Sequence, residues 1–221
     1  MSTVSEIMEI VKQQTGVDTN YDDKILYGIN WAQQQIEAVK FNFLLVTIET
    51  LSLYSGTTKY ALPSDFGTLS AIYVIDSTGV RQQLVEGTLD DIVLYPQSST
   101  GVPRYYCVAE TIGTTQAICI GCPTTGVGNT ATYSYYKRLM TVTDADESIV
   151  STYYKDAPLV SGALFKVWQG LERPQFADAA YNEFLNDMRI MCSEMPHTGT
   201  TYDEIMQKQI LMPQGKTNEE P

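Results

Sequence analysis

The sequence predicts an α+β fold: an α-helical bundle built from N- and C-terminal helices, with an inserted antiparallel β-barrel or sandwich-like domain. Apolar residues recur at helical spacing at both ends of the chain, whereas the middle holds short segments rich in Thr, Tyr, Val and Ile. From Pro196 onward the chain has few bulky residues, which predicts an extended C-terminal tail. The predicted divisions are residues 1–45 and 151–195 for the helices, 46–150 for the β-rich domain and 196–221 for the tail.

The composition allows a large hydrophobic core and argues against a nucleic-acid-binding groove. Of the 221 residues, 43% are hydrophobic. A chain of this size and composition can form a stable core without disulfides or structural metal ions. The formal net charge is −12 and the isoelectric point is about 4.4. A groove that binds phosphates needs clustered Lys and Arg, and the closest cluster is the single pair Lys137-Arg138. The acidic residues are spread over the whole chain. This distribution favours solubility and disfavours adhesion to DNA.

Two helices are predicted at the N-terminal end. Thr3 followed by Glu6 has the spacing of a capping box, and Gly16 is placed to end the first helix. The second helix follows the polar run 20–23, whose acidic side chains suit a helix N-terminus. The apolar faces consist of Val4, Ile7, Met8 and Val11 in the first helix and Ile25, Leu26, Ile29, Ala32, Ile36 and Val39 in the second.

The middle of the chain predicts short strands separated by turns. Turn residues recur near 55–58, 76–79, 101–103, 123–128 and 144–148. The segments between them favour strands because they are rich in β-branched and aromatic residues. Residues 84–95 allow either a helix or a loop, and the acidic group Asp144, Asp146 and Glu147 is expected to cap the next helix.

Helix is predicted again from about Thr152, with Pro158 either in the first turn or at a kink. The two apolar faces here consist of Leu159, Val160, Ala163, Leu164, Val167 and Trp168, and of Phe176, Ala180, Phe184, Met188 and Met191. In the tail, a short apolar stripe is formed by Tyr202, Ile205, Met206, Ile210, Leu211 and Met212. This stripe is too short for a stable isolated helix, so it suits folding against a partner.

No catalytic constellation is predicted. His197 is the only histidine and falls in the expected linker, where it cannot be held in register as a general base. Cys119 and Cys122 form a C-x-x-C motif, but it follows a predicted strand without a βαβ pattern. Small packing residues are therefore expected there, rather than a redox pair or half a zinc site. We expect no enzyme activity, no cofactor and no metal.

The sequence also gives an expectation for the compartment. Its first residues lack the basic and apolar regions of a signal peptide, and no apolar run approaches the length of a membrane span. The four cysteines are therefore expected to be free thiols in a reducing cytoplasm.

Several motifs occur in an order that resembles one family of phage proteins. They are Phe41-Asn42-Phe43-Leu44, Gly56 followed by the YALPSDF segment 60–66, Gly101-Val102-Pro103, the tyrosine-rich segment 133–136 and the helix 154–164. Over roughly residues 1–195, this order resembles the head-to-tail adaptor proteins of short-tailed bacteriophages, also called tail tubular A-type or head completion proteins.

The resemblance implies a structural virion protein at the head–tail interface, made in the host cytoplasm and without membrane contact. It would form a ring of about twelve copies that joins the portal protein to a tail nozzle or tubular protein. DNA would pass through the lumen during ejection without sequence-specific binding. The tail would dock on the portal through Tyr202, Ile205, Met206, Ile210, Leu211 and Met212.

Two other functions stay open on the residues alone. The 15 tyrosines could form the stacking platform of a carbohydrate- or surface-binding module of a phage tail or fibre. The C-x-x-C motif leaves a thiol oxidoreductase as a third reading. Because the tyrosines lack basic partners, strand packing and protein contact are their expected roles.

Overall fold

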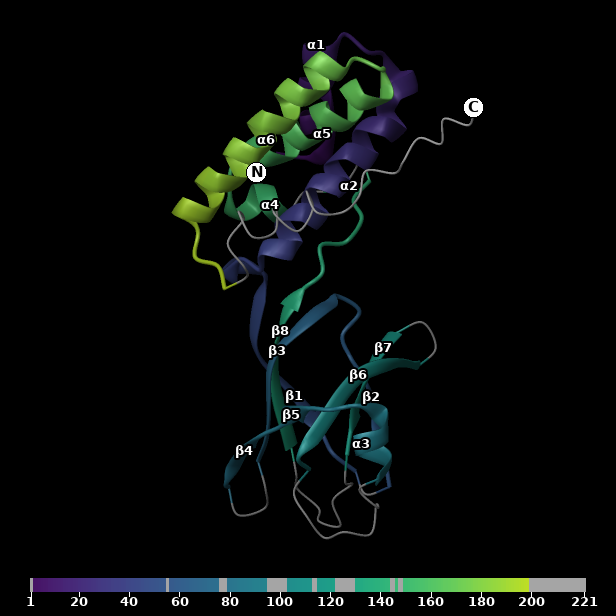
Figure 1. The fold of residues 1–221 in the computed structure, drawn as a ribbon, viewed down its shortest axis with the longest axis vertical. Coiled ribbons are helices and arrows are strands. Elements are labelled where there is room, and N and C mark those ends of the chain that lie inside the picture. The colour runs from purple at the N-terminus through teal and green to yellow at the C-terminus, as the bar shows by residue number, and fades with distance from the viewer. Residues whose placement is uncertain are drawn as a thin grey trace, which may run out of the picture. The chain divides into compact units, whose positions relative to one another are not determined.

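Two compact units make up the chain, in a computed structural model that describes residues 2–54, 56–75, 79–94, 103–112, 115–121, 130–143, 146 and 149–198. The helical unit consists of Met1–Phe43 together with the residues from Leu139 onward, and the β unit is Leu44–Arg138. Helices fill the first unit and strands dominate the second (Figure 1). The predicted α+β fold class is confirmed. The predicted tail after residue 198 lies outside the described residues.

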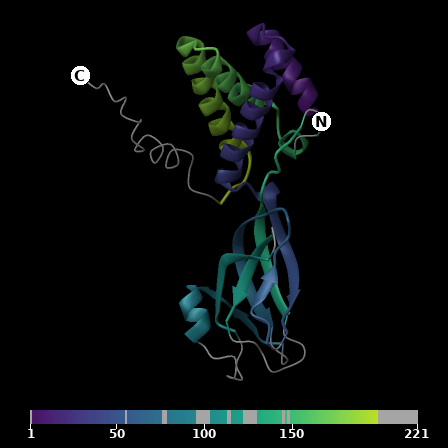
Figure 2. The same cartoon turned by 90° about the vertical axis from the view of Figure 1, so that its right-hand side faces the viewer.

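The helical unit is a bundle in which the fifth helix is central. α5 contacts α1, α2 and α6 (Figure 1 and Figure 2). Short 3-10 turns at Thr19–Tyr21 and Asn42–Leu44 flank α2. The α-helices described in this unit are α1 (Val4–Thr15), α2 (Asp22–Val39), α4 (Ile149–Tyr153), α5 (Ala157–Gly170) and α6 (Pro174–Glu194).

The helix ends agree with the sequence in several places. The capping box of α1 is present: the Glu6 amide donates to the Thr3 hydroxyl, and the Thr3 amide donates to the Glu6 carboxylate. Gly16 ends α1 in the left-handed conformation, which glycine adopts without steric cost. Pro158 lies in the first turn of α5, where its missing N–H is not needed, so it causes no kink.

Small residues let α2 and α5 approach closely. A Cβ built on Gly28 of α2 would lie 2.7 Å from the Ala163 Cα of α5, and one on Gly162 would lie 2.6 Å from the Ala32 Cβ. Neither position has room for a larger side chain. The two helices therefore pack closely at these two points, which are about one helical turn apart on α2 and fall on adjacent residues of α5.

Polar side chains of α2 form hydrogen bonds with the backbone of residues 139–142, where the chain returns to the helical unit. The Asn30 amide oxygen accepts from the Val142 amide at 2.9 Å, and its nitrogen donates to the Val142 carbonyl at 3.2 Å. Gln33, only 2% exposed, donates to the Met140 carbonyl at 3.4 Å. The Glu37 carboxylate accepts from the Leu139 amide at 3.0 Å. Residues spaced by three and four along one helix face thus act as partners for an extended segment.

The β unit contains two four-stranded sheets, with strand orders β1-β8-β3-β4 and β2-β7-β6-β5. All pairs are antiparallel except β5 with β6. Its elements are β1 (Leu45–Ser52), β2 (Lys59–Ala61), β3 (Phe66–Ile75), β4 (Arg81–Gln83), β5 (Val85–Glu86), α3 (Leu89–Leu94), β6 (Tyr105–Ile112), β7 (Thr115–Ile120) and β8 (Thr130–Lys137).

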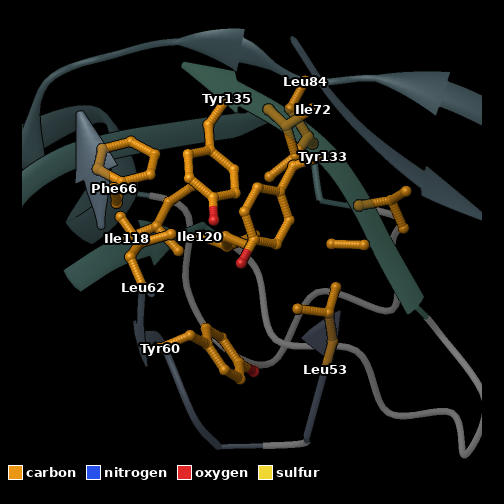
Figure 3. Close-up of a cluster of buried hydrophobic side chains, with 12 residues drawn as sticks. Leu53, Tyr60, Leu62, Phe66, Ile72, Leu84, Ile118, Ile120, Tyr133 and Tyr135 are labelled. Carbon is orange, nitrogen blue, oxygen red and sulfur yellow. The ribbon is translucent and has the colours of Figure 1, made fainter. Parts of the chain in front are cut away.

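Both sheets contribute to one buried core. Tyr133 and Tyr135 project from β8, and Phe66 lies beside Tyr135 with ring centroids 5.4 Å apart (Figure 3). The core members with 7% exposure or less are Leu53, Tyr60, Leu62, Phe66, Ile72, Val74, Leu84, Ile118, Ile120, Ala131, Tyr133 and Tyr135. The sandwich-like form of the prediction describes this arrangement.

The YALPSDF segment has structural roles throughout. The Tyr60 hydroxyl accepts from the Tyr54 amide at 3.0 Å and donates to the Thr57 carbonyl at 2.9 Å, which closes the turn before β2. The Asp65 carboxylate accepts from the Tyr135 hydroxyl at 2.9 Å and lies 3.3 Å from the Lys137 ammonium. Burial and this hydrogen bond raise the pKa of Tyr135. This segment therefore closes the turn before β2 and ties the start of β3 to β8.

Three local features were left open or were expected to differ from what the structure describes. Within the segment 84–95, Val85–Glu86 form β5 and Leu89–Leu94 form α3, which starts with a Thr88–Asp91 capping box; Tyr95 lies outside the described residues. β5 pairs in parallel with β6, because α3 lies on the connection between them. The Asp146 side chain accepts from the Thr143 hydroxyl and amide, so it closes a turn; Asp144, Glu147 and Ser148, directly before α4, lie outside the described residues.

None of the helices described here combines the length and the apolar character that a bilayer span requires.

Candidate partner-binding surfaces

The docking residues predicted in the tail are outside the part of the chain that the structure describes. These are Tyr202, Ile205, Met206, Ile210, Leu211 and Met212. The structure does describe the chain as far as residue 198, just beyond the end of α6.

Residues 196–198 run antiparallel to residues 40–42, which directly follow α2, and are hydrogen-bonded to them. The Asn42 amide donates to the Pro196 carbonyl at 2.9 Å, and the Thr198 amide donates to the Lys40 carbonyl at 3.3 Å. His197 forms a β-bridge with Phe41. The expected linker therefore has a fixed beginning.

An aromatic cluster surrounds this bridge, which we call the tail anchor: Phe41, Phe43, Tyr153 and His197. Phe41 is fully buried, and its ring stacks on Phe43 with a centroid distance of 5.7 Å. Phe43 stacks on Tyr153 at 5.1 Å, and the His197 ring packs edge-on against Phe41 at 5.7 Å. His197 was expected to fall in a linker that does not hold its side chain in place; it is instead partly buried, with a packing role. The Phe41–Leu44 patch in the sequence was the available signal for this anchor.

A second surface lies on α2 and α5, where lysines stack on aromatic rings. The Lys166 ammonium lies 4.6 Å from the Trp31 ring centroid and 4.7 Å from that of Phe165. Burial lowers the pKa of Lys166. Lys24 lies 4.8 Å from the Tyr21 ring centroid. Such stacked cations are stabilised by the negative ring face.

A shallow hollow of about 340 Å³ lies at this lysine–aromatic surface. Tyr27 borders it and is 62% exposed. Its lining residues are Asp23, Lys24, Tyr27, Lys166, Gln169 and Gly170. Exposed tyrosines are typical of protein-binding surfaces. Sequence reasoning missed this surface, although Tyr27 and Trp31 have the i, i+4 spacing that places them on one side of α2.

The tyrosines of the β unit do not form an exposed platform in the described residues. Tyr60, Tyr133, Tyr135 and Tyr136 are buried. Tyr54, at 64% exposure, is the one described tyrosine of this unit that is classed as exposed. Stacking of successive bases or sugars needs several open rings, so the arrangement gives little support to a carbohydrate-binding module.

The cysteine environment does not favour redox catalysis. Cys119 lies within strand β7 and is 2% exposed, and burial raises the pKa of its thiol. A catalytic thiol needs the opposite shift. Cys122, the other half of the C-x-x-C motif, lies outside the described residues. Across the described ranges, no group of three or more His, Cys, Asp or Glu side chains is placed to hold a metal ion.

The comparisons with known proteins point to a structural role. No curated protein matches the chain. Residues 2–203, nearly the whole chain, match the family described as SU10 adaptor protein. This match covers both units and the tail anchor. The chain therefore belongs to the SU10 adaptor protein family, whose members are structural adaptor proteins of phages rather than enzymes.

Proposed function

We propose that this adaptor forms a ring that joins the portal to the tail and extends the DNA conduit at the head–tail interface of the virion. The family match over residues 2–203 carries the proposal, because it makes the chain a phage structural adaptor. The ring, its number of copies, the portal and the tail nozzle or tubular protein below it are parts of the proposal. The net charge of −12 supports passage of DNA without adhesion to the wall.

The tail anchor supports portal docking by the residues that follow it. Backbone hydrogen bonds with Lys40, which accepts, and Asn42, which donates, hold residues 196–198 in place. A docking segment that starts at a fixed point reaches a limited volume, and this raises its effective concentration at a neighbouring portal site. The stripe 202–212 then supplies apolar side chains that can fold against the portal.

Truncation after Thr198 tests portal docking. The shortened chain keeps the tail anchor, so we expect the same unfolding midpoint as the full chain and at least a hundredfold loss of portal affinity. Calorimetry with purified portal measures the affinity, and negative-stain images of the mixture show whether rings sit on the portal. A matched variant of the full chain, Ile205→Asp with Ile210→Asp, should lose affinity to a similar degree. Portal binding at full affinity by the truncated chain would show that the docking assignment is wrong.

The lysine–aromatic surface is our candidate for contact with a second copy in the ring. A ring requires head-to-tail contacts between different surfaces of identical subunits. Two lysines, Lys24 and Lys166, line this surface, whereas the whole chain carries 26 acidic and 14 basic residues. The surface of a neighbouring copy is therefore acidic on average, and its charge is complementary.

The variant Tyr27→Ala with Lys24→Glu tests this contact. Both side chains are exposed, so the fold should be unaffected. We expect rings on the portal to disappear from the images, while calorimetry still detects binding of single subunits through the tail. Rings of unchanged number and size would exclude this surface from the contact. Lys155→Glu, which changes the same charge at a side chain with 71% exposure, is the control.

A further inference from the structure

Two cysteines lie directly opposite each other on neighbouring strands. In the antiparallel pair β6–β7, Cys107 is in register with Cys119. Both are free thiols in the structure. In an antiparallel pair, side chains of directly opposed residues project from the same face of the sheet.

That face is the one turned away from the core of the β unit. The neighbours of Cys119 along β7, Ile118 and Ile120, belong to the buried core. Likewise, the neighbours of Cys107 along β6, Tyr106 and Val108, pack against that core. Because side chains alternate along a strand, both thiols lie on the opposite face.

The strand pairing places the Cα atoms of the two cysteines within the range found in disulfides. The Gly121 amide donates to the Tyr105 carbonyl at 3.0 Å, which makes 105 and 121 a hydrogen-bonded pair. Hydrogen-bonded pairs alternate along the ladder, so Cys107 and Cys119 form the next one, with Cα atoms about 5.5 Å apart. Disulfides join cysteines whose Cα atoms are about 4.4–6.8 Å apart and whose Cβ atoms are about 3.5–4.5 Å apart. Opposed Cβ atoms in such a pair lie about 4.5–5.5 Å apart, so closure has to draw the two strands together by up to about 1 Å. A disulfide strained in this way is easily reduced again.

The two thiols differ in access. Cys119 is 2% exposed, whereas Cys107 is partly exposed. Burial raises the pKa of both thiols, and the Glu86 carboxylate raises that of Cys107 further. Both therefore stay protonated and reduced in a neutral, reducing cytoplasm. An oxidant from solution therefore reacts with Cys107 first. Cys119, on the neighbouring strand, can then attack the mixed disulfide formed on Cys107.

We propose that Cys107 and Cys119 form an oxidation-sensitive pair that closes to an intrachain disulfide between β6 and β7. The oxidant is a low-molecular-weight disulfide such as oxidised glutathione. The Cys107 thiolate attacks one of its sulfurs and releases one glutathione thiolate, leaving a mixed disulfide. Cys119 then loses its proton and attacks the Cys107 sulfur, which releases the second glutathione. The protein loses two electrons and two protons, and the oxidant is reduced to two thiols.

The pair gives the β unit two covalent states suited to two environments. Both thiols stay reduced while the chain is made in a reducing cytoplasm, and they can oxidise when a particle carries the protein outside. Closure fixes β6 to β7 across a short hairpin. It does not depend on ring formation or portal docking, so it can be tested with the purified chain alone.

Peptide mapping after oxidation tests the proposal. The full chain is treated with oxidised glutathione at low protein concentration, alkylated and digested under non-reducing conditions with a protease that cuts after glutamate. Cleavage after Glu110 separates Cys107 from Cys119. We expect the two fragments to stay linked until a reductant is added. We also expect the chain to lose two of its four thiols, faster as the pH rises because the thiolate is the attacking form.

Single serine variants identify the partners. Cys107→Ser and Cys119→Ser should abolish the linked fragments, whereas Cys122→Ser and Cys192→Ser should keep them. If Cys119→Ser stays linked to the same extent as the native chain, the partner is Cys122 and the proposal is wrong. Fragments of the oxidised native chain that separate without reductant would overturn it as well.

Discussion

The Tyr60 hydroxyl explains why tyrosine stands at the start of the YALPSDF segment. Its ring is 7% exposed within the core, while its oxygen bonds to the backbone of Tyr54 and Thr57. A buried hydroxyl without such partners would be costly. One side chain therefore fills the core and closes a turn.

Replacing Tyr60 with Phe should remove the turn closure but keep the packing. The Tyr54 amide and Thr57 carbonyl then lose their partner, so we expect the free energy of unfolding to fall by about 1–2 kcal/mol. Urea denaturation followed by tyrosine fluorescence measures the change. Tyr54→Phe removes a hydroxyl from an exposed ring and should alter stability by less than about 0.5 kcal/mol. Equal effects of the two substitutions would contradict the assigned role.

Single residues also show the limits of the sequence. The capping box at Thr3 and Glu6 and the end at Gly16 were predicted, because each depends on local chemistry. For Pro158, the first turn was one of two positions left open. His197 was misjudged because its partner, Phe41, is distant in sequence. Its bridge to Phe41 follows from tertiary packing, which no local pattern reveals.

At the scale of the element, α2 has a different task on each side. Its apolar side includes Gly28 and Ala32, whose small size lets α5 pack closely. On its polar side, Asn30, Gln33 and Glu37 form hydrogen bonds with the backbone of residues 139–142. The apolar side was predicted from helical spacing. The polar side was not, because amide and carboxylate side chains at helical spacing look the same whether they bind water or backbone.

Gly28→Ala should destabilise the bundle. The added Cβ would lie 2.7 Å from the Ala163 Cα, and backbone cannot move aside cheaply. We expect a loss of about 1–3 kcal/mol, measured by chemical denaturation followed by far-ultraviolet circular dichroism.

Gly170→Ala is the matched control for this prediction. Its Cβ would meet only the flexible Lys24 side chain, at 3.5 Å or more, and alanine favours helix. Stability should therefore stay the same or rise slightly. A loss at Gly170 equal to that at Gly28 would show that the close contact between α2 and α5 is not the cause.

At the scale of the whole molecule, the helical unit is discontinuous in sequence, whereas the β unit is one continuous segment, Leu44–Arg138. The strands on which the chain enters and leaves the β unit pair with each other: Leu45 of β1 lies opposite Tyr136 of β8. The two ends of the segment are therefore neighbours. An insertion with neighbouring ends can be removed without stretching its host.

Replacing residues 44–138 with a short Gly/Ser linker should leave a folded helical unit. Its core residues in α1, α2, α5 and α6 are retained, so we expect cooperative thermal unfolding and a helical circular dichroism spectrum. Size-exclusion chromatography and thermal denaturation check this, with the full chain alongside. A shortened chain that is soluble but shows no cooperative transition would mean that the helical unit needs the β unit to fold.

The discontinuity of the helical unit also has a consequence for synthesis on the ribosome. At about 5–20 residues per second, the chain from the end of α2 to the end of α5 takes on the order of ten seconds to emerge. During that interval the apolar faces of α1 and α2 lack their final partner, while the β unit is complete and can fold. We expect the nascent β unit to gain structure first, and the unpaired N-terminal helices to be the part of the newborn chain that the host's chaperones bind.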